Sequence, residues 1–149
     1  MTKKTASRLA LGALLAAGAA LSPPAAADAE AARYVARPAD GGRMAIDASG
    51  SRLRRIAARL PSGCESNFGQ TWTTPLAIKL SGDEPMRSGR FSIQGQAPNK
   101  VRYQIDGRRR GRAISGRVRL TFLDLDFVGV DESFLCDTGT IRFRAVRRR

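Results

Sequence analysis

Arginine is the residue type through which this chain is best equipped to do chemistry. In "GRVRLTF" and "TIRFRAV" arginines alternate with apolar residues, so in a β-strand Arg117, Arg119, Arg142 and Arg144 would all point away from the core. The planar guanidinium group binds phosphate, sulfate and carboxylate through paired hydrogen bonds. If the strands are neighbours in one sheet, this spacing predicts a contiguous cationic surface.

Other segments add to the same surface. Arg102 alternates with Tyr103 in "VRYQIDG", and "GRRRGR" is expected to be an arginine-bearing loop. The candidate anion-binding residues are Arg102, Arg108, Arg110, Arg117, Arg119, Arg142 and Arg144. Such a surface attracts polyanions with strong salt dependence, and lipopolysaccharide, teichoic acid, acidic glycan and DNA are the polyanions expected. Arginine is also frequent in GC-rich coding sequences and keeps sheet edges from pairing, so composition alone leaves a purely structural role open.

The sequence lacks the residue types and motifs on which the common catalytic mechanisms depend. The chain contains no histidine, which removes Ser–His and Cys–His nucleophile systems and the commonest metal ligand. The glycine-rich segments "GRRRG" and "SGSR" lack the G-x-x-x-x-G-K-[ST] spacing of a phosphate-binding loop. We therefore expect no enzyme, no cofactor and no metal.

The segment "LDLDF" is the strongest alternative to that expectation. It resembles the carboxylate-bearing strand of retaining β-glucanases, whose pattern is E-[IL]-D-[IVL]-E, and Asp124 and Asp126 match two of its positions. The third position is Val128, and retention requires two carboxylates about 5 Å apart. A carboxylate-dependent glycan-active enzyme therefore stays as a third function hypothesis. These aspartates with Asp131, Glu132 and Asp137 could supply oxygen ligands to Ca²⁺, but the EF-hand spacing is missing.

The elements that position the arginines are predicted to be strands. Period-2 runs such as "PLAIKL", "RFSIQG" and "VRYQIDG" are separated by Gly, Pro, Asn and Asp at short spacing. This pattern predicts an all-β fold, a single antiparallel β-sandwich with one disulfide, or alternatively a small β-barrel. In "TFLDLDF" the inward parity slips after Phe122, which predicts a bulge or hairpin near Leu123.

The segment from Leu53 to Leu60 is ambiguous. Leu53, Ile56, Ala57 and Leu60 fall at helical spacing, whereas "SGS" directly before them is typical of a hairpin turn. We favour a strand.

The N-terminus has the pattern of an export signal. A basic start, the apolar run Leu9 to Leu21 and small residues before Ala27 or Ala29 predict a signal peptide over residues 1–27, cleaved after either alanine. Residues 28–42 are expected to be a flexible segment and residues 43–149 the folded domain. Residues 1–27 hold three of the 26 basic residues and none of the 13 acidic ones, so the remaining chain has a net charge of +10. The sequence has no second apolar stretch that would predict a transmembrane segment. The mature protein is therefore expected in the periplasm or outside the cell.

The two cysteines, Cys64 and Cys136, are expected to form one structural disulfide, because the chain is predicted to be exported. Trp72 lies in the polar segment "FGQTWTTP" shortly after Cys64 and is expected to cap the core beside that disulfide.

The C-terminal half of the chain resembles a broad set of uncharacterised exported bacterial proteins. The shared pattern is F-x-I-x-G, then G-x-x-x-G-x-x-x-x-G-x-[VIL], then C-x-[ST]-G-x-[IV]-x-[FW]-x-A-x-R. The matching residues are Phe91, Ile93, Gly95, Gly107, Gly111, Ala113, Gly116, Val118, Cys136, Thr138, Gly139, Ile141, Phe143, Ala145 and Arg147. The resemblance implies a disulfide-bridged β-sandwich, favours the strand at Leu53 to Leu60, and brings no activity or site residues with it.

The function predicted from the sequence is an exported, monomeric, non-enzymatic module that binds anionic envelope or extracellular polymers through an Arg-rich face. The alternative is a protein-interaction role, as an inhibitor or assembly subunit, through the segments "GDEPMRSG" and "GRRRGR".

Overall fold

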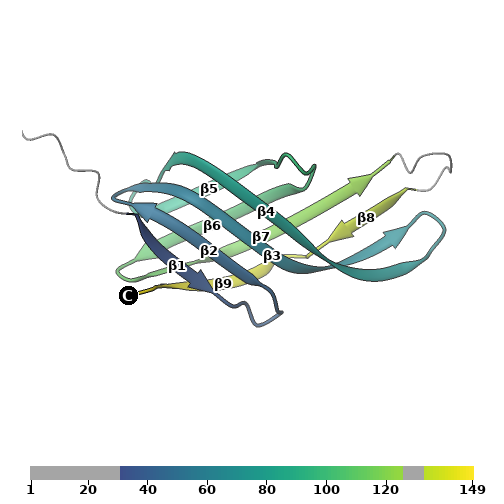
Figure 1. The fold of residues 1–149 in the computed structure, drawn as a ribbon, viewed down its shortest axis with the longest axis horizontal. Coiled ribbons are helices and arrows are strands. Elements are labelled where there is room, and N and C mark those ends of the chain that lie inside the picture. Colours follow the sequence, from purple (N-terminus) through teal and green to yellow (C-terminus); the bar gives the residue numbers. More distant parts are fainter. Residues whose placement is uncertain (1–30, 126–132) are drawn as a thin grey trace, which may run out of the picture.

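A computed structural model describes residues 31–125 and 133–149, and every regular element in these two ranges is a β-strand. The strands are β1 (Ala32–Ala36), β2 (Arg43–Ser49), β3 (Arg52–Ser66), β4 (Thr71–Pro85), β5 (Arg90–Gln96), β6 (Arg102–Arg110), β7 (Ala113–Asp124), β8 (Phe134–Asp137) and β9 (Ile141–Arg147) (Figure 1). None of the described residues forms a helix with the length and apolarity needed to cross a membrane. The predicted signal peptide lies outside the described residues.

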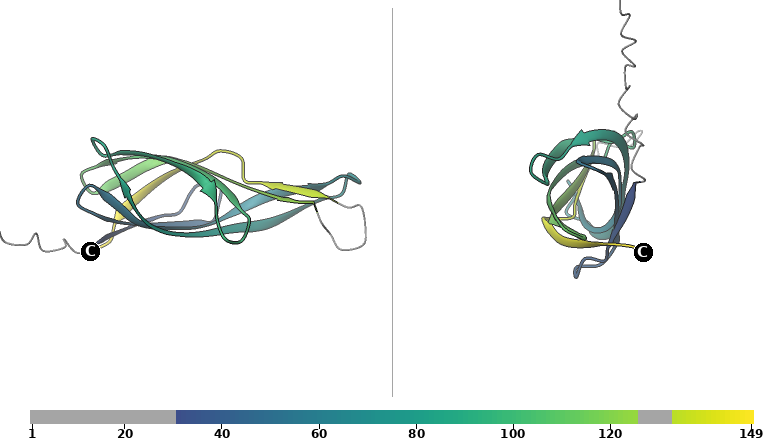
Figure 2. Two further views of the ribbon diagram at one scale, coloured as in Figure 1. Left: turned by 90° about the horizontal axis from the view of Figure 1, so that it is seen from above. Right: turned by 90° about the vertical axis from the view of Figure 1, so that its left-hand side faces the viewer.

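The all-β antiparallel fold is confirmed, and its sheet closes on itself. The strands follow the order β4-β3-β2-β1-β9-β7-β6-β5, and β8 pairs with both β3 and β7. The path from β3 through β2, β1, β9, β7 and β8 back to β3 is therefore a closed ring of six antiparallel strands. Figure 2 shows this ring from its end. Of the two arrangements expected, the sheet adopts the small barrel, with β4, β5 and β6 as extra strands outside the ring.

The core is built from the inward side chains that alternate along each strand, and both the ring strands and the extra strands β4, β5 and β6 contribute to it. Leu60, Ile105, Ile114 and Leu120 have no exposed surface, and the core is otherwise built from residues of the same inward parity. The inward residues predicted for the last strand, Ile141, Phe143 and Ala145, are also buried. The period-2 pattern therefore identifies the core correctly in the C-terminal half.

The ambiguous segment Leu53 to Leu60 belongs to strand β3. Leu53, Ile56, Ala58 and Leu60 are all buried. The register of β2 against β3 shifts between Asp47 and Ala48, whose partners are Arg55 and Leu53, and this places one extra residue, Arg54, in β3. Because of this bulge, the buried residues Leu53 and Ile56 are three positions apart, as inward residues are in a helix, although the segment is a strand.

The disulfide between Cys64 and Cys136 is confirmed, and it lies where the ring closes. The two cysteines face each other directly across β3 and β8. Strand β8 has only four residues, yet its pairing with β3 and β7 completes the ring. The disulfide therefore links the shortest strand of the ring to the longest one.

The start of the sheet and the course of β7 differ from those predicted. Strand β1 lies between β2 and β9, so the sheet includes residues ahead of the predicted domain start at residue 43. Of the bulge or hairpin predicted near Leu123, the bulge is wrong for the described part of β7, which pairs in continuous register from Thr121 to Asp124 with the next strand in sequence, β8, running antiparallel to it. Because no bulge restores the inward parity, Leu123 and Leu125 are exposed.

Candidate functional site

The predicted arginines lie on neighbouring strands. Strands β9, β7, β6 and β5 are consecutive in the sheet, so their outward side chains form one surface. We call this surface the Arg face, and its arginines are Arg90, Arg102, Arg108, Arg110, Arg117, Arg119, Arg142 and Arg144.

The strand register brings the central arginines into two adjacent rows. Arg117 on β7 is directly opposite Arg142 on β9. In the next row Arg144 faces Ser115, Ser115 faces Arg108, and Arg108 faces Arg90. Residues directly opposite each other in antiparallel strands have Cβ atoms only about 5 Å apart, so like charges repel there.

This positive charge is largely unbalanced. Within residues 31–125 and 133–149, Arg119 is the only arginine of the Arg face with a carboxylate at ion-pair distance. Asp106 is opposite Arg117, but its carboxylate accepts a hydrogen bond from Ser92 Oγ at 2.6 Å. The pKa of Arg108 is lowered by the charges of Arg110 and Arg90, which shows how closely the cations crowd.

A hollow on the Arg face gathers three of these cations and one more, Arg87. It has a volume of about 780 Å³ and lies over β5, β6 and β7, beside the end of β4. Arg87, Arg90, Arg108 and Arg117 line it, together with the two carboxylates of Glu84 and Asp106. An anionic group in this hollow would meet several guanidinium groups at once, which suits phosphate, sulfate or carboxylate.

Arg119 and Arg102 occupy a different part of the Arg face, closer to β8. Arg119 Nε donates to Asp137 Oδ1 at 3.1 Å, and Arg119 Nη2 donates to the second carboxylate oxygen. Arg102 faces Thr121, which in turn faces Asp137. Because Arg119 already has a carboxylate partner, it is less available to a ligand than the central arginines.

The ion pair of Asp137 predicts a pH dependence of stability. The hydrogen bond from Arg119 lowers the pKa of Asp137, against an opposing effect of burial, and the backbone N–H of Gly139 adds to the lowering. A carboxyl whose pKa is lower in the folded state stabilises the fold above its unfolded pKa of about 3.9, and this contribution is lost as the pH falls further. We expect Asp137→Asn to flatten the acid limb of a plot of unfolding free energy against pH. Urea denaturation at a series of pH values measures it, and an unchanged acid limb would contradict the assignment.

The prediction of a loop over "GRRRGR" is corrected in part. Strand β6 continues to Arg110, and only Gly111 and Arg112 form the turn to β7. Arg108 and Arg110 are therefore held on a strand beside β7 and not on a loop. This fixes their spacing relative to the other arginines.

The described residues give little support to the hypothesis of a carboxylate-dependent glycan-active enzyme. Asp124 ends β7 opposite Phe134. Asp126, Asp131 and Glu132 lie outside the described residues. Among the residues that are described, no three side chains of the metal-ligating types come together.

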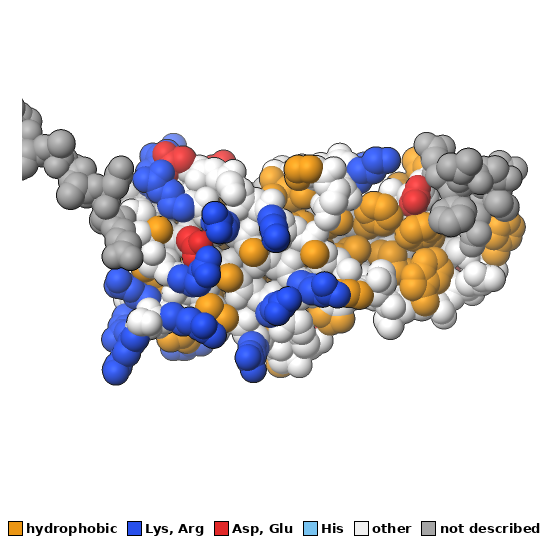
Figure 3. All heavy atoms as spheres, in the orientation of Figure 1, with side chains coloured by type: hydrophobic (Ala, Val, Ile, Leu, Met, Phe, Trp, Pro, Cys, Tyr) orange, Lys and Arg blue, Asp and Glu red, His pale blue; other side chains and the backbone are white. Residues whose placement is uncertain are grey.

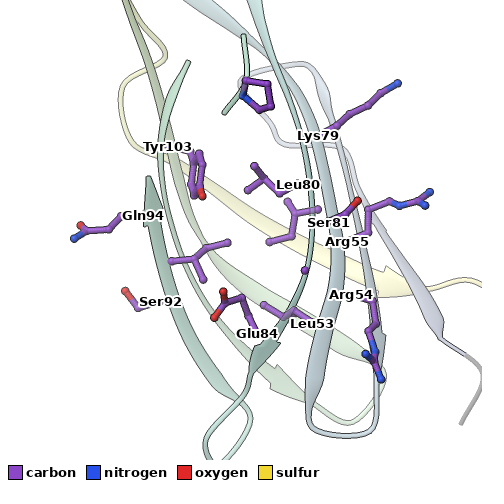
Figure 4. A pocket seen from close by; sticks show the side chains of 14 residues that line it. Leu53, Arg54, Arg55, Lys79, Leu80, Ser81, Glu84, Ser92, Gln94 and Tyr103 are labelled. Carbon is purple, nitrogen blue, oxygen red and sulfur yellow. The ribbon is translucent and has the colours of Figure 1, made fainter. Parts of the chain in front are cut away.

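A second cavity lies between β4 and β5 and borders the Arg face hollow, with which it shares Glu84 and Ser92. Its volume is about 490 Å³, and Figure 4 shows Leu53, Leu80 and Tyr103 pointing toward one another across it. Arg54 and Arg55 point away from the cavity, and Glu84 is the charged side chain that points into it. The cavity suits apolar groups better than anions.

Sequence reasoning missed Arg87 and Arg90. Arg90 was recognisable, because Phe91 is inward in "RFSIQG" and the preceding residue must then be outward. Arg87 lies in the turn between β4 and β5, and its backbone pairs with that of Arg90. No strand pattern covers a turn, so only the structure brings Arg87 to the hollow.

Comparison with known proteins adds no relative: no family model matches the chain, and neither a curated protein nor a solved structure is significantly similar to it.

Proposed function

We propose that this chain is an exported, non-enzymatic binding module that holds an anionic polymer against its Arg face. The observation that carries the proposal is the direct pairing of Arg117 with Arg142, beside the row that contains Arg144, Arg108 and Arg90. Like charges at this spacing repel one another unless an anion lies between them. A polymer with repeating anionic groups contacts several arginines at once and releases its counterions.

Export is the part of the proposal that rests on the sequence and the disulfide. Residues 1–27 have the charge and hydrophobicity pattern of a signal peptide. Disulfides persist in oxidising compartments, and Cys64–Cys136 is such a bond. The anionic polymers of those compartments are lipopolysaccharide, teichoic acid, acidic glycan and extracellular DNA.

Reversing the central charges tests the proposal. We expect the variant with Arg108, Arg117, Arg142 and Arg144 changed to Glu to lose binding to lipopolysaccharide, heparin, teichoic acid and DNA. Arg119 is left unchanged, because reversing it would break its ion pair with Asp137. Titrations at roughly 50 and 200 mM salt give the salt dependence, and for DNA the slope of log affinity against log salt should fall by about four.

A matched control removes the same charge from another side of the molecule. Arg37, Arg43, Arg59 and Lys79 are exposed, and the last three lie on the outer side of β2, β3 and β4. Changing these four to Glu gives the same net charge as the test variant. Equal loss in both variants would mean that only net charge matters, and retained binding in the test variant would contradict the proposal.

One observation favours a second candidate, a protein-interaction role. Strands β4 and β5 are the two ends of the sheet path, so each has an edge that pairs with no other strand among the described residues. An extended peptide can add to such an edge through backbone hydrogen bonds. Binding of that kind would depend only weakly on salt and would survive reversal of the Arg face.

A further inference from the structure

Strands β4 and β5 follow each other in the chain, but they lie at opposite ends of the sheet path instead of forming a hairpin. The gap between them is closed at both ends. At one end the backbones of Arg87 and Arg90 are paired. At the other end Asn99 Nδ2 donates to the backbone oxygen of Ala77 at 2.7 Å. The two strands therefore frame an opening in the sheet.

The cavity of about 490 Å³ lies in this opening, and inward side chains of four strands form its walls. Leu53 and Ile56 come from β3, Leu80 from β4, Ile93 from β5 and Tyr103 from β6. The two residues of β3 are buried and the other three are half-buried, so apolar surface faces the opening. A concave apolar site of this size is typical of small-molecule binding.

Gly82 keeps this cavity open. It lines the cavity and has the same parity along β4 as Leu80 and Glu84, which Figure 4 shows pointing into it. A Cβ atom on Gly82 would have no heavy atom within 4 Å. A large side chain at this position would therefore fill the space that a ligand could use.

The apolar cavity continues directly into the hollow of the Arg face. The two share Glu84 on β4 and Ser92 on β5. Along β5, residues 92–94 line the cavity and residues 90–92 line the hollow. One molecule with an apolar part and a charged part can therefore occupy both.

Positive charge dominates beyond the junction of the two cavities. The hollow is lined by Arg87, Arg90, Arg108 and Arg117. Strand β4 ends far from β8, in the half of the molecule over which Figure 3 shows Lys and Arg. Of the two carboxylates at the hollow, Asp106 accepts a hydrogen bond from Ser92, and Glu84 lies at the junction. Several guanidinium groups favour a head group with more than one negative charge, and a phosphate monoester has this property near pH 7.

We propose that a single amphiphilic molecule, an alkyl or acyl chain that carries a phosphate monoester, binds across the two cavities. Its chain lies among Leu53, Leu80 and Tyr103, and its phosphate lies in the hollow against Arg87 and Arg90. The inference deepens the proposed function, on which its head-group part rests, by naming a lipid phosphate as a ligand of the Arg face. The apolar part rests on the cavity between β4 and β5.

Matched ligands test the two parts of the site. Decyl phosphate carries both parts, decanol carries the chain, and ethyl phosphate carries little more than the head group. By isothermal titration calorimetry below the micelle concentration, decyl phosphate should bind at least about tenfold more tightly than either of the others, because each buried CH₂ group and each guanidinium contact adds to the affinity. Decyltrimethylammonium, which has the opposite charge, should bind no more tightly than decanol.

Filling the cavity tests the apolar part. Gly82→Leu should lower the affinity for decyl phosphate at least about tenfold, because the leucine takes the place of the chain. Gly63→Leu is the matched control. Gly63 lies on β3 and lines neither cavity, a Cβ atom there also has no heavy atom within 4 Å, and binding should be unchanged. Urea denaturation checks that both variants are folded.

Changing the charges tests the head-group part. Arg87→Gln with Arg90→Gln should lower the affinity for decyl phosphate to about that of decanol, since the phosphate loses two of its cations. Glu84→Gln should raise the affinity about threefold, the size of an interaction between exposed charges, because the carboxylate repels the phosphate. Binding of decanol should not change in either variant.

The possible outcomes separate this inference from the proposed function. Decyl phosphate binding that survives Gly82→Leu would refute the inference, as would decanol binding as tight as that of decyl phosphate. Binding of DNA and heparin without binding of decyl phosphate would also refute it and leave the proposed function standing. The converse result, decyl phosphate binding that is lost in Gly82→Leu in a protein that binds no anionic polymer, would contradict the proposed function and leave the inference standing.

Discussion

The variant with Cys64 and Cys136 both changed to Ser is expected to be less stable than the oxidised protein by about 4 kcal/mol. The two cysteines are 72 residues apart, and a crosslink of that span removes much of the conformational freedom of the unfolded chain. The bond also holds β8 against β3 at the closure of the ring, so without it β8 is attached by the backbone pairing of four residues.

Urea denaturation of the oxidised protein and the double variant measures this loss. The unmodified protein in reductant is the control: if it unfolds at the same urea concentration as the double variant, the loss belongs to the crosslink and not to packing of the sulfur atoms. Amide hydrogen exchange should show β8 as the first strand to lose protection. An oxidised protein no more stable than the reduced one would contradict the expectation.

Gly116→Ala is expected to destabilise the fold by at least about 3 kcal/mol, the upper end of the usual cost of overfilling a packed site. A Cβ atom on Gly116 would lie 1.9 Å from the backbone oxygen of Asp106 and 2.8 Å from the Cα atom of Gly107. Both atoms belong to the backbone of the neighbouring strand β6, which cannot move aside without breaking its pairing with β7.

Two further glycine variants make this prediction specific. Gly107→Ala should cost less, because its Cβ would meet the ring of Phe91 at 2.3 Å and a side chain can shift. Gly82→Ala, on β4, has no heavy atom within 4 Å of the added carbon and is the control. Its effect should be within about 1 kcal/mol and in the stabilising direction. Urea midpoints in the order Gly82, Gly107, Gly116 from highest to lowest confirm the assignment, and any other order contradicts it.

The strands and the core were predictable from the sequence because both depend on local alternation. Ile141, Phe143 and Ala145 are inward because every second residue of a strand points the same way, and no distant contact is needed to see it. The disulfide followed from the cysteine count. The sequence leaves a sandwich and a small barrel both open, because closure of the ring depends on the pairing of β8 with β3, and neither segment alone specifies that pairing.

The site was predictable in its residues but not in its geometry. Alternation places Arg117 and Arg142 outward, yet only the strand order makes them direct partners. The carboxylate that neutralises Arg119 comes from β8, and the addition of Arg87 comes from a turn. In each case a contact between segments far apart in the chain decides which arginine is available.

Residues 121–125 show that a change of parity has more than one structural explanation. The change at Phe122 and Leu123 predicts a bulge or hairpin if large apolar residues must be inward. The strand instead continues regularly and leaves Leu123 and Leu125 exposed. A conflict between parity and hydrophobicity can therefore mark an exposed apolar surface as well as an irregular strand.

The pairing of β1 with β9 determines the order in which this chain can fold. Tyr34 is opposite Arg147, so the first and last described strands are neighbours in the finished sheet. Such a contact has a very large sequence separation, and contacts of this kind slow folding. The hairpins of β2 with β3 and β5 with β6 can form early, but the barrel cannot close until residues near the C-terminus are available. A chain delivered gradually across a membrane would therefore stay open, with its core accessible, until the last strand emerged.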